Sequence, residues 1–308
     1  MTEIVLLISK SFGLECLKYI IDHDKKVLNR VYTIDDRNDK RTKFQEIIDL
    51  CKENQIEFLA VSTNKEFELK FKQRSDIPDY VIVVGWYWII SRDVLNFVKK
   101  EIIGFHYSLL PKYRGGSPLV WAIINNEKET GVTMFCFRDE IDNGPIIEQT
   151  KISIEEIDDI NSLVEKCNNI MLTQLENNLP KIIDGKMEVN FQNEMEATYC
   201  SNRIEEFGKI NWYKPARSIY NFVRAQTFPY PGAFAFLEDE TKIRVLKAKM
   251  VSDVWYSVPG QVVRINKEQG SILVGVGDNE VIEILQIYIN GSEMSPVNVF
   301  KSIKSRIL

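Results

Sequence analysis

Residues 103–121, IGFHYSLLPKYRGGSPLVW, decide how the rest of this chain is interpreted. The stretch opens as a short apolar run and places His106 where a buried strand is expected to end. Pro111 fixes one backbone angle and removes a hydrogen-bond donor, whereas Gly115 and Gly116 allow backbone geometry that is closed to other residues. The pattern predicts a strand end that delivers one imidazole into a loop-walled pocket.

Few side chains could replace this imidazole as a base, because the chain contains only two histidines. His23 lies in a polar helix end, where a solvated side chain is expected. A second polar strand end, residues 138–145 (RDEIDNGP), follows His106 after about thirty positions. A carboxylate such as Asp142 can hold an imidazole in one tautomer and stabilise its charged form, so His106 and Asp142 together suit general-base chemistry.

Four blocks extend this pattern in a fixed order: His-x-Ser-Leu-Leu-Pro at 106–111, Arg-Gly-x-x-Pro at 114–118, Thr-Gly-Val-Thr at 130–133 and Asp-x-Gly-Pro-Ile-Ile at 142–147. Together they resemble the folate-dependent formyltransferase family, and the resemblance extends over nearly the whole chain. It is closest to the nucleotide-sugar N-formyltransferases. The resemblance implies transfer of a formyl group from 10-formyltetrahydrofolate to a primary amine, without a metal.

The resemblance also implies roles for individual residues. His106 is expected to be the general base and Asp142 the group that orients it. The further positions expected at the reacting centre are Gly104 and Ser108. The positions expected to bind the folate donor are Trp86, Trp88, Ile89, Ile90, Leu109, Arg138, Asp139, Glu140 and Ile141. The positions expected to bind the acceptor are Lys10, Ser11, Tyr113, Arg114, Gly115 and Gly116.

One position departs from the family pattern. The family has Asn-x-His where this chain has Gly104-Phe105-His106, so the amide that polarises the formyl carbonyl is missing. One oxyanion donor is typically worth roughly 3–4 kcal/mol of transition-state stabilisation. A backbone N–H near Gly104, the Ser108 hydroxyl, protonated His106 or water remain as substitutes. A homologue that binds folate or a nucleotide with weak or no catalysis remains a rival hypothesis.

Composition limits the remaining function classes. The chain has 308 residues, 44% of them hydrophobic, and a formal net charge of −5, so no general basic field attracts nucleic acid. Five scattered cysteines without a Cys-x-x-Cys motif favour free thiols in a reducing cytoplasm. The first apolar run is too short to span a membrane and lacks a signal-peptide layout. Monomer and homodimer both stay open.

The first 200 residues alternate between strand and helix patterns and predict a doubly wound, Rossmann-like α/β catalytic domain. The expected helices are residues 12–22, 42–54 and 159–179. The expected strands are residues 3–9, 27–33, 58–61, 80–85, 132–137 and 146–152. The loop at 9–13 lacks a Gly-x-Gly-x-x-Gly pattern, which argues against a dinucleotide site. The mixed charges of residues 35–41 predict a solvated loop.

Residues 201–308 predict a small, β-rich, OB-like domain, and the resemblance implies that a junction helix near residues 209–226 opens it. The expected strands are residues 233–237, 243–249, 260–265, 271–276 and 281–287. Because no helix follows residues 275–279 (GVGDN), these residues predict a hairpin turn rather than a phosphate loop. Five short strands suit a partly open barrel.

The acceptor amine is the least determined part of the function. The chain from Ser201 onward has fourteen Lys and Arg against eleven Asp and Glu, and acidic residues stand where a basic insertion would contact tRNA. Phosphate recognition needs lysine and arginine. The sequence therefore favours an amino sugar on a nucleotide carrier and makes nucleic acid an unlikely partner, with methionyl-tRNA as the alternative acceptor.

Overall fold

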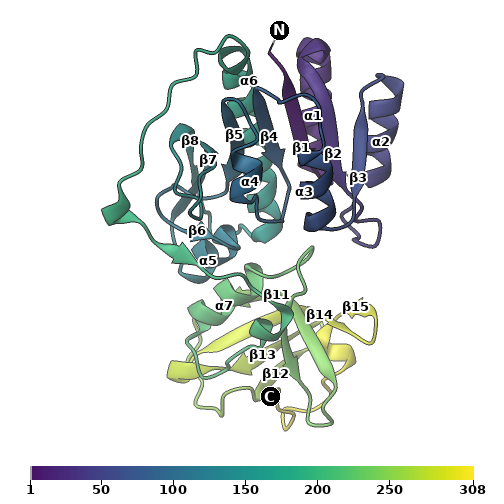
Figure 1. The fold of residues 1–308 in the computed structure, drawn as a ribbon. Helices are drawn as coiled ribbons and strands as arrows, with labels where there is room; N and C mark the ends of the chain where they lie inside the picture. The colour runs from purple at the N-terminus through teal and green to yellow at the C-terminus, as the bar shows by residue number, and fades with distance from the viewer. Residues whose placement is uncertain (1) are drawn as a thin grey trace. The chain divides into compact units, whose positions relative to one another are not determined.

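A computed structural model describes residues 2–308, and their contacts divide the chain into two compact units. The first unit contains the residues up to Gly115 together with Gly131–Ile152 and Lys166–Tyr199. The second contains Gly116–Thr130, Ser153–Glu165 and Cys200–Leu308. Figure 1 follows the chain from the purple strands of the first unit to the yellow strands of the second.

The first unit is built on a seven-stranded sheet with the order β3-β2-β1-β4-β5-β7-β8. Its strands are β1 (Ile4–Ile8), β2 (Leu28–Ile34), β3 (Phe58–Val61), β4 (Tyr80–Val84), β5 (Glu101–His106), β7 (Glu129–Cys136) and β8 (Ile146–Ser153). The first five of these pair in parallel, and β7 runs antiparallel to β5. Every residue of β1 and β4 is buried, as expected for central parallel strands.

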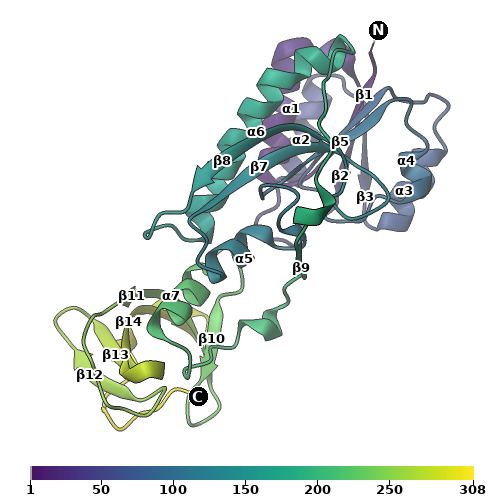
Figure 2. The same ribbon diagram turned by 90° about the vertical axis from the view of Figure 1, so that its left-hand side faces the viewer.

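Helices cover both faces of this sheet, which confirms the doubly wound fold. One face carries α1 (Lys10–Asp24), α2 (Phe44–Glu53) and α6 (Ile160–Ile183), and the other carries α3 (Asn64–Lys72) and α4 (Arg92–Leu95), as Figure 2 shows. Helix α1 buries Leu14, Leu17 and Ile20, whose spacing places them on one side of the helix.

Helices α3 and α4 were not predicted from the sequence. Helix α3 is mostly polar, and its buried side chains are Phe67 and Phe71, one turn apart. Its start is fixed by a variant of the capping box, because the Thr63 hydroxyl accepts from the Glu66 N–H at 3.1 Å and the Glu66 carboxylate accepts from the N–H of Ser62, one residue before the N-cap, at 2.8 Å. Two aromatic contacts and a good cap are therefore enough to form a helix that lacks a full apolar stripe.

The second unit contains a β-sheet with the order β10-β11-β14-β13-β12, to which β15 adds beside β14. The strands are β10 (Ala233–Phe236), β11 (Lys242–Met250), β12 (Val262–Asn266), β13 (Ser271–Gly275), β14 (Val281–Ile289) and β15 (Ser292–Met294). All five predicted strands are present, and β13 and β14 form the predicted antiparallel hairpin. Helices α5 (Pro118–Ile124) and α7 (Ala216–Arg224) belong to the same unit.

Strand β6 (Arg114–Gly115) follows the His106 strand in the chain and pairs with the short strand β9 (Tyr199–Cys200). The five cysteines form no disulfide with one another in this structure, and Cys200 is more exposed than the other four. Within residues 2–308, none of the helices combines the length and the apolar character that crossing a bilayer requires.

Candidate active site

His106 is the last residue of β5, and its ring is largely buried. The ring Nε2 lies 2.7 Å from the carbonyl oxygen of Tyr113, which can only accept a hydrogen bond, so Nε2 carries a hydrogen. The ring Nδ1 lies 3.5 Å from Oδ2 of Asp142. In a neutral ring, Nδ1 therefore holds the free lone pair, and Asp142 stands beside the position that a bound proton would take.

Residues 113–115 hold both members of this pair. The Tyr113 carbonyl fixes His106, and the Gly115 N–H donates to Asp142 Oδ2 at 2.7 Å. Tyr113 and Asp142 both have left-handed backbone geometry, with φ of 60° and 51°. Such geometry is uncommon outside glycine and is often retained at functional sites.

Arg114 is fully buried, although the sequence favours an acceptor-binding role for it. Its guanidinium donates to Gln192 Oε1 and to both carboxylate oxygens of Glu194, at 2.7–3.1 Å. The Glu194 carboxylate raises the pKa of Arg114. Gln192 in turn donates to the carbonyl oxygens of Asp142 and Gly144 at 2.8 and 2.7 Å. Arg114 thus supports the loop that carries Asp142.

Gly104 precedes His106 by two residues on the same side of β5, and a phenyl ring lies over it. A Cβ atom built on Gly104 would lie 2.3 Å from Cε1 and 2.7 Å from Cζ of Phe137. The Phe137 ring stacks on Phe135 with the centroids 5.1 Å apart, and Phe135 meets the His106 ring edge-on at 6.5 Å. The space that a side chain at position 104 would occupy is therefore filled.

Ser108 and Leu109 support the turn after the strand. The Ser108 hydroxyl donates to the Lys112 carbonyl at 2.6 Å, and the Ser108 carbonyl accepts from the Thr133 hydroxyl at 2.7 Å. Leu109 packs against Gly131, where an added Cβ would lie 2.4 Å from Leu109 Cδ2. Both residues are engaged within the turn, so the Ser108 hydroxyl already has an acceptor.

A cleft of about 490 Å³ opens beside Phe137. Its lining includes the predicted donor-binding residues Arg138, Asp139 and Glu140. The other lining residues are Leu95, Asn96, Lys100, Glu101, Ile102, Phe137 and Asn143. Arg138 forms a two-pronged ion pair with Glu101, which raises the pKa of the guanidinium. Ile141, also expected to bind the donor, is 62% exposed.

The aromatic loop after β4 contributes to the hydrophobic core on one face of the sheet. Trp86 packs edge-on against Phe67 at 4.9 Å and against Trp88 at 5.3 Å. Trp88 and Ile90 are half-buried in the same cluster, whereas Ile89 is exposed. None of the four predicted donor-binding residues of this loop lines the cleft. Among the described residues, the Trp86 indole N–H is one of the buried polar groups without a hydrogen-bond partner.

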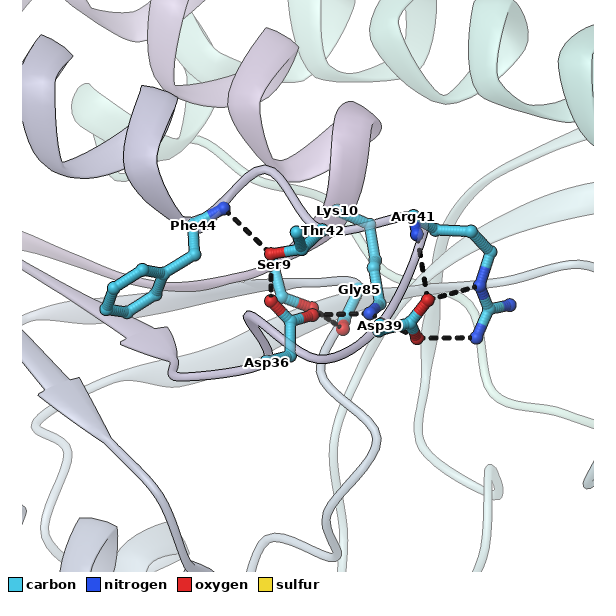
Figure 3. A network of polar contacts seen from close by, with 8 residues as sticks. All are labelled: Ser9, Lys10, Asp36, Asp39, Arg41, Thr42, Phe44 and Gly85. Carbon is cyan, nitrogen blue, oxygen red and sulfur yellow. Dashed lines mark hydrogen bonds and ion pairs between the residues drawn. The ribbon is translucent and has the colours of Figure 1, made fainter.

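Lys10 and Ser11 were predicted to contact the acceptor. Figure 3 shows the Lys10 ammonium between the carboxylates of Asp36 and Asp39, with Asp39 also bound by Arg41. The Lys10–Asp39 distance is 2.7 Å, and Arg41 and Lys10 together lower the pKa of Asp39. The charge of Lys10 is therefore already compensated. Ser11 lies in the first turn of α1 and is exposed.

Gly115 and Gly116 have different surroundings. Gly115 has a φ of 96° and belongs to the first unit, with its N–H on Asp142. Gly116 belongs to the second unit, where an added Cβ would lie 1.8 Å from Asn202 Oδ1. Within residues 2–308, no group of three His, Cys, Asp or Glu side chains is arranged to hold a metal ion.

Sequence reasoning missed several contributors to this region, among them the Tyr113 carbonyl, Phe137, Gln192 and the cleft residue Leu95. The carbonyl carries no signal in residue type, and Gln192 follows His106 by more than eighty positions. Phe137 could have been found from the sequence, because it is a large residue directly after β7, the strand that pairs with β5 at Gly104.

Comparison with known proteins gives this geometry a context. Residues 4–175 match the model of the formyl transferase family, and residues 204–304 match the formyl transferase C-terminal domain. The methionyl-tRNA formyltransferase of Caldanaerobacter subterraneus subsp. tengcongensis is 32% identical over 295 residues, which cover 94% of this chain and 93% of the relative.

Solved structures share the fold at lower identity. The N-formyltransferase from Helicobacter canadensis, in complex with folinic acid and dTDP-3-aminofucose, has a TM-score of 0.68 at 22% identity, covering 92% of this chain and 99% of the other. The methionyl-tRNA formyltransferase from Clostridium thermocellum has a TM-score of 0.58 at 18% identity, covering 82% and 94%. With family models matching both domains and a relative above 30% identity over nearly its full length, this chain belongs to the formyl transferase family.

Proposed function

We propose that this protein transfers a formyl group from 10-formyltetrahydrofolate to the primary amine of a nucleotide-linked amino sugar. The observation that carries the chemistry is the fixed tautomer of His106. Because Nε2 is committed to the Tyr113 carbonyl, Nδ1 is the atom left to accept a proton. The four free thiols that are buried suit a reducing compartment, so the proposal places the enzyme in the cytoplasm.

The proposed reaction begins when the neutral amine attacks the formyl carbon. The new N–C bond forms while the carbonyl π electrons move to oxygen, and the attacking nitrogen becomes positively charged. His106 Nδ1 takes its proton, and Asp142 stabilises the resulting imidazolium across 3.5 Å. The tetrahedral intermediate then collapses: the oxyanion electrons re-form the carbonyl, the bond to the folate N10 breaks, and N10 receives the proton held by His106 Nδ1, directly or through water, which returns the imidazole to its neutral form. General-base catalysis of this type contributes about 10²–10⁴-fold.

Two of the candidate oxyanion donors are already engaged. The Ser108 hydroxyl donates to Lys112, and β5 is paired on both sides at Gly104, with Val83 and with Phe135. Protonated His106 and water remain. This favours an oxyanion that forms next to the imidazolium, as the amine releases its proton.

The donor is proposed to place its flat ring in the cleft beside Phe137. A volume of about 490 Å³ is within the usual range for a ligand pocket. Leu95, Ile102 and Phe137 supply apolar surface, while Asn143 and the loop from Arg138 to Glu140 supply polar groups. Phe137 also packs on Phe135, and Phe135 meets the ring of the proposed base edge-on.

An amino-sugar nucleotide is preferred as the acceptor because the β2–α2 loop offers little free positive charge. Arg37 pairs with Asp35, and Arg41 pairs with Asp39. In the second unit, Lys242 and Arg244 share Glu205. Cations paired within the protein contribute less to phosphate binding than free ones, because contact with tRNA would require breaking these pairs.

Methionyl-tRNA is the second candidate, and one observation favours it. The relative with 32% identity over 94% of this chain is a methionyl-tRNA formyltransferase. This relationship includes the C-terminal domain match at residues 204–304.

The test is a competition between acceptors. Purified protein and 10-formyltetrahydrofolate are incubated with methionyl-tRNA and with a panel of amino-sugar nucleotides, and mass spectrometry measures the product that has gained a formyl group. The proposal expects a kcat/KM at least about a hundredfold higher for one of the amino sugars, the scale of a specific binding contribution of some 3 kcal/mol. Preference for methionyl-tRNA would select the second candidate, and no transfer to any amine would reject both.

A further inference from the structure

The Phe137 ring occupies the position that the strand leaves empty at Gly104. The face of β5 that includes His106 presents Ile102, Gly104 and His106 in alternation, because successive strand residues point to opposite faces. Gly104 pairs with Phe135 on β7, and the Phe137 N–H donates to the Ile102 carbonyl at 2.8 Å. The ring of Phe137 is thereby brought over Gly104 from the neighbouring strand.

The fit between the two residues is close. A Cβ atom at position 104 would lie 2.3 Å from Cε1 of the ring, well inside van der Waals contact. The ring is held by stacking on Phe135, with an angle of 26° between the planes, and it packs against the apolar cluster beneath α3 and α4. Glycine and phenylalanine thus form one packing unit, in which each residue limits the other.

Resting on the proposed formyl transfer, we infer that Phe137 is a positioning residue that takes the place of a side chain at position 104. Its ring is a wall of the donor cleft and stacks on Phe135, which in turn packs against the His106 ring. The ring acts on the donor by shape, as one wall of the cleft, where an amide at position 104 would have acted by hydrogen bonding. Gly104 and the Phe137 ring together therefore form a rebuilt packing unit at one wall of the cleft.

A double-mutant cycle on the full-length protein tests this inference. Gly104→Asn alone forces the new side chain against the ring, so both turnover and the melting temperature should fall. Phe137→Ala alone removes the wall, so the dissociation constant of 5-formyltetrahydrofolate, an unreactive isomer, should rise by about tenfold. In Gly104→Asn/Phe137→Ala the amide has room, and turnover should exceed that of Phe137→Ala by about tenfold or more, since one placed donor is worth about 10²–10³ in kcat.

Phe97→Ala is the matched control, because Phe97 is a half-buried phenylalanine of the same cluster that does not border Gly104. Combined with Gly104→Asn, it should give additive changes in melting temperature and in kcat. Gly104→Asn and Phe137→Ala should instead have non-additive effects on the melting temperature and on kcat. A split between KM and kcat separates positioning from simple loss of structure, since Phe137→Ala should raise the KM for the donor more than it lowers kcat.

The possible failures are distinguishable. If the wild type transfers no formyl group, the proposed function is wrong. The melting temperatures of the four proteins would still show whether the Phe137 ring restricts the side chain at position 104. If Gly104→Asn is equally harmful with and without the Phe137 ring, the packing unit does not exist. If the double variant is no more active than Phe137→Ala, the ring does not stand in for the side chain and the inference fails.

Discussion

Replacing Arg114 by lysine should destabilise the protein and slow it without weakening acceptor binding. The guanidinium is fully buried and bonds to Gln192 and Glu194 through several nitrogens, whereas an ammonium cannot reproduce that fork. Bonds to charged groups are worth roughly 1.5–3 kcal/mol each. Glu194 is 59% exposed, so water can replace part of the lost bonds to its carboxylate, and we expect the free energy of unfolding to fall by about 2 kcal/mol.

For a protein of this size, that loss lowers the melting temperature by about 4–8 °C. Gln192 also loses part of its anchor, so Asp142 is held less well and kcat should fall by about tenfold, a scale set by the sensitivity of catalysis to small displacements. The KM for the amine should stay within about twofold, because Arg114 is not expected to contact the acceptor. If Arg114 did bind the acceptor, the substitution would weaken the binding free energy by at least the contribution of one charged hydrogen bond.

Arg37→Lys is the control, because Arg37 makes a two-pronged bond to Asp35 at the surface. Exposed pairs contribute roughly 0–1 kcal/mol, so its melting temperature should change little. Thermal melts and steady-state kinetics of both variants decide the matter. A raised KM with an unchanged melting temperature for Arg114→Lys would refute this account and return Arg114 to acceptor binding.

Three further predictions follow from the same geometry. With ¹⁵N-labelled histidine, the neutral His106 ring should show a protonated Nε2 and an unprotonated Nδ1, with His23→Gln assigning the two rings; the opposite tautomer would contradict the Tyr113 contact. Arg41 and Lys10 lower the pKa of Asp39 below its ordinary value of 3.8, so ionised Asp39 stabilises the fold above that pH, and this stabilisation is lost as the pH falls below it. Asp39→Asn should therefore make the melting temperature fall less steeply at acidic pH. An unchanged acidic part of the profile would count against the network. Burial raises the pKa of Cys16, Cys51, Cys136 and Cys167 to about 12, so an aromatic disulfide reagent at pH 8 should label Cys200 first, and rapid labelling of several thiols would contradict the packing.

The fold was accessible from sequence because its signals are local. Apolar runs such as residues 80–84 predict central parallel strands, and turn residues such as those at 275–279 separate short strands in the second unit. Helix α3 escaped prediction because its helical signal rests on a capping box and two phenylalanines rather than on an apolar stripe.

The site was less accessible because its determinants are non-local. The sequence brings attention to His106 and Asp142, which lie side by side in the structure, yet the tautomer depends on a backbone carbonyl. Lys10 has the appearance of a free loop cation until folding places Asp36 and Asp39 around it. Gly104 has the appearance of a loss until the Phe137 ring is seen above it.

Single-turnover formylation with His106→Asn shows whether His106 Nδ1 accepts the amine proton during formyl transfer. Enzyme in excess over 10-formyltetrahydrofolate and the preferred amine is quenched over time, and mass spectrometry measures the formylated product. The rate should fall by about 10²–10⁴-fold with an unchanged dissociation constant for 5-formyltetrahydrofolate, because asparagine can keep a hydrogen bond to Tyr113 but cannot take a proton. A His106→Asn enzyme that forms product within threefold of the wild-type rate, a difference below about 1 kcal/mol, would contradict it.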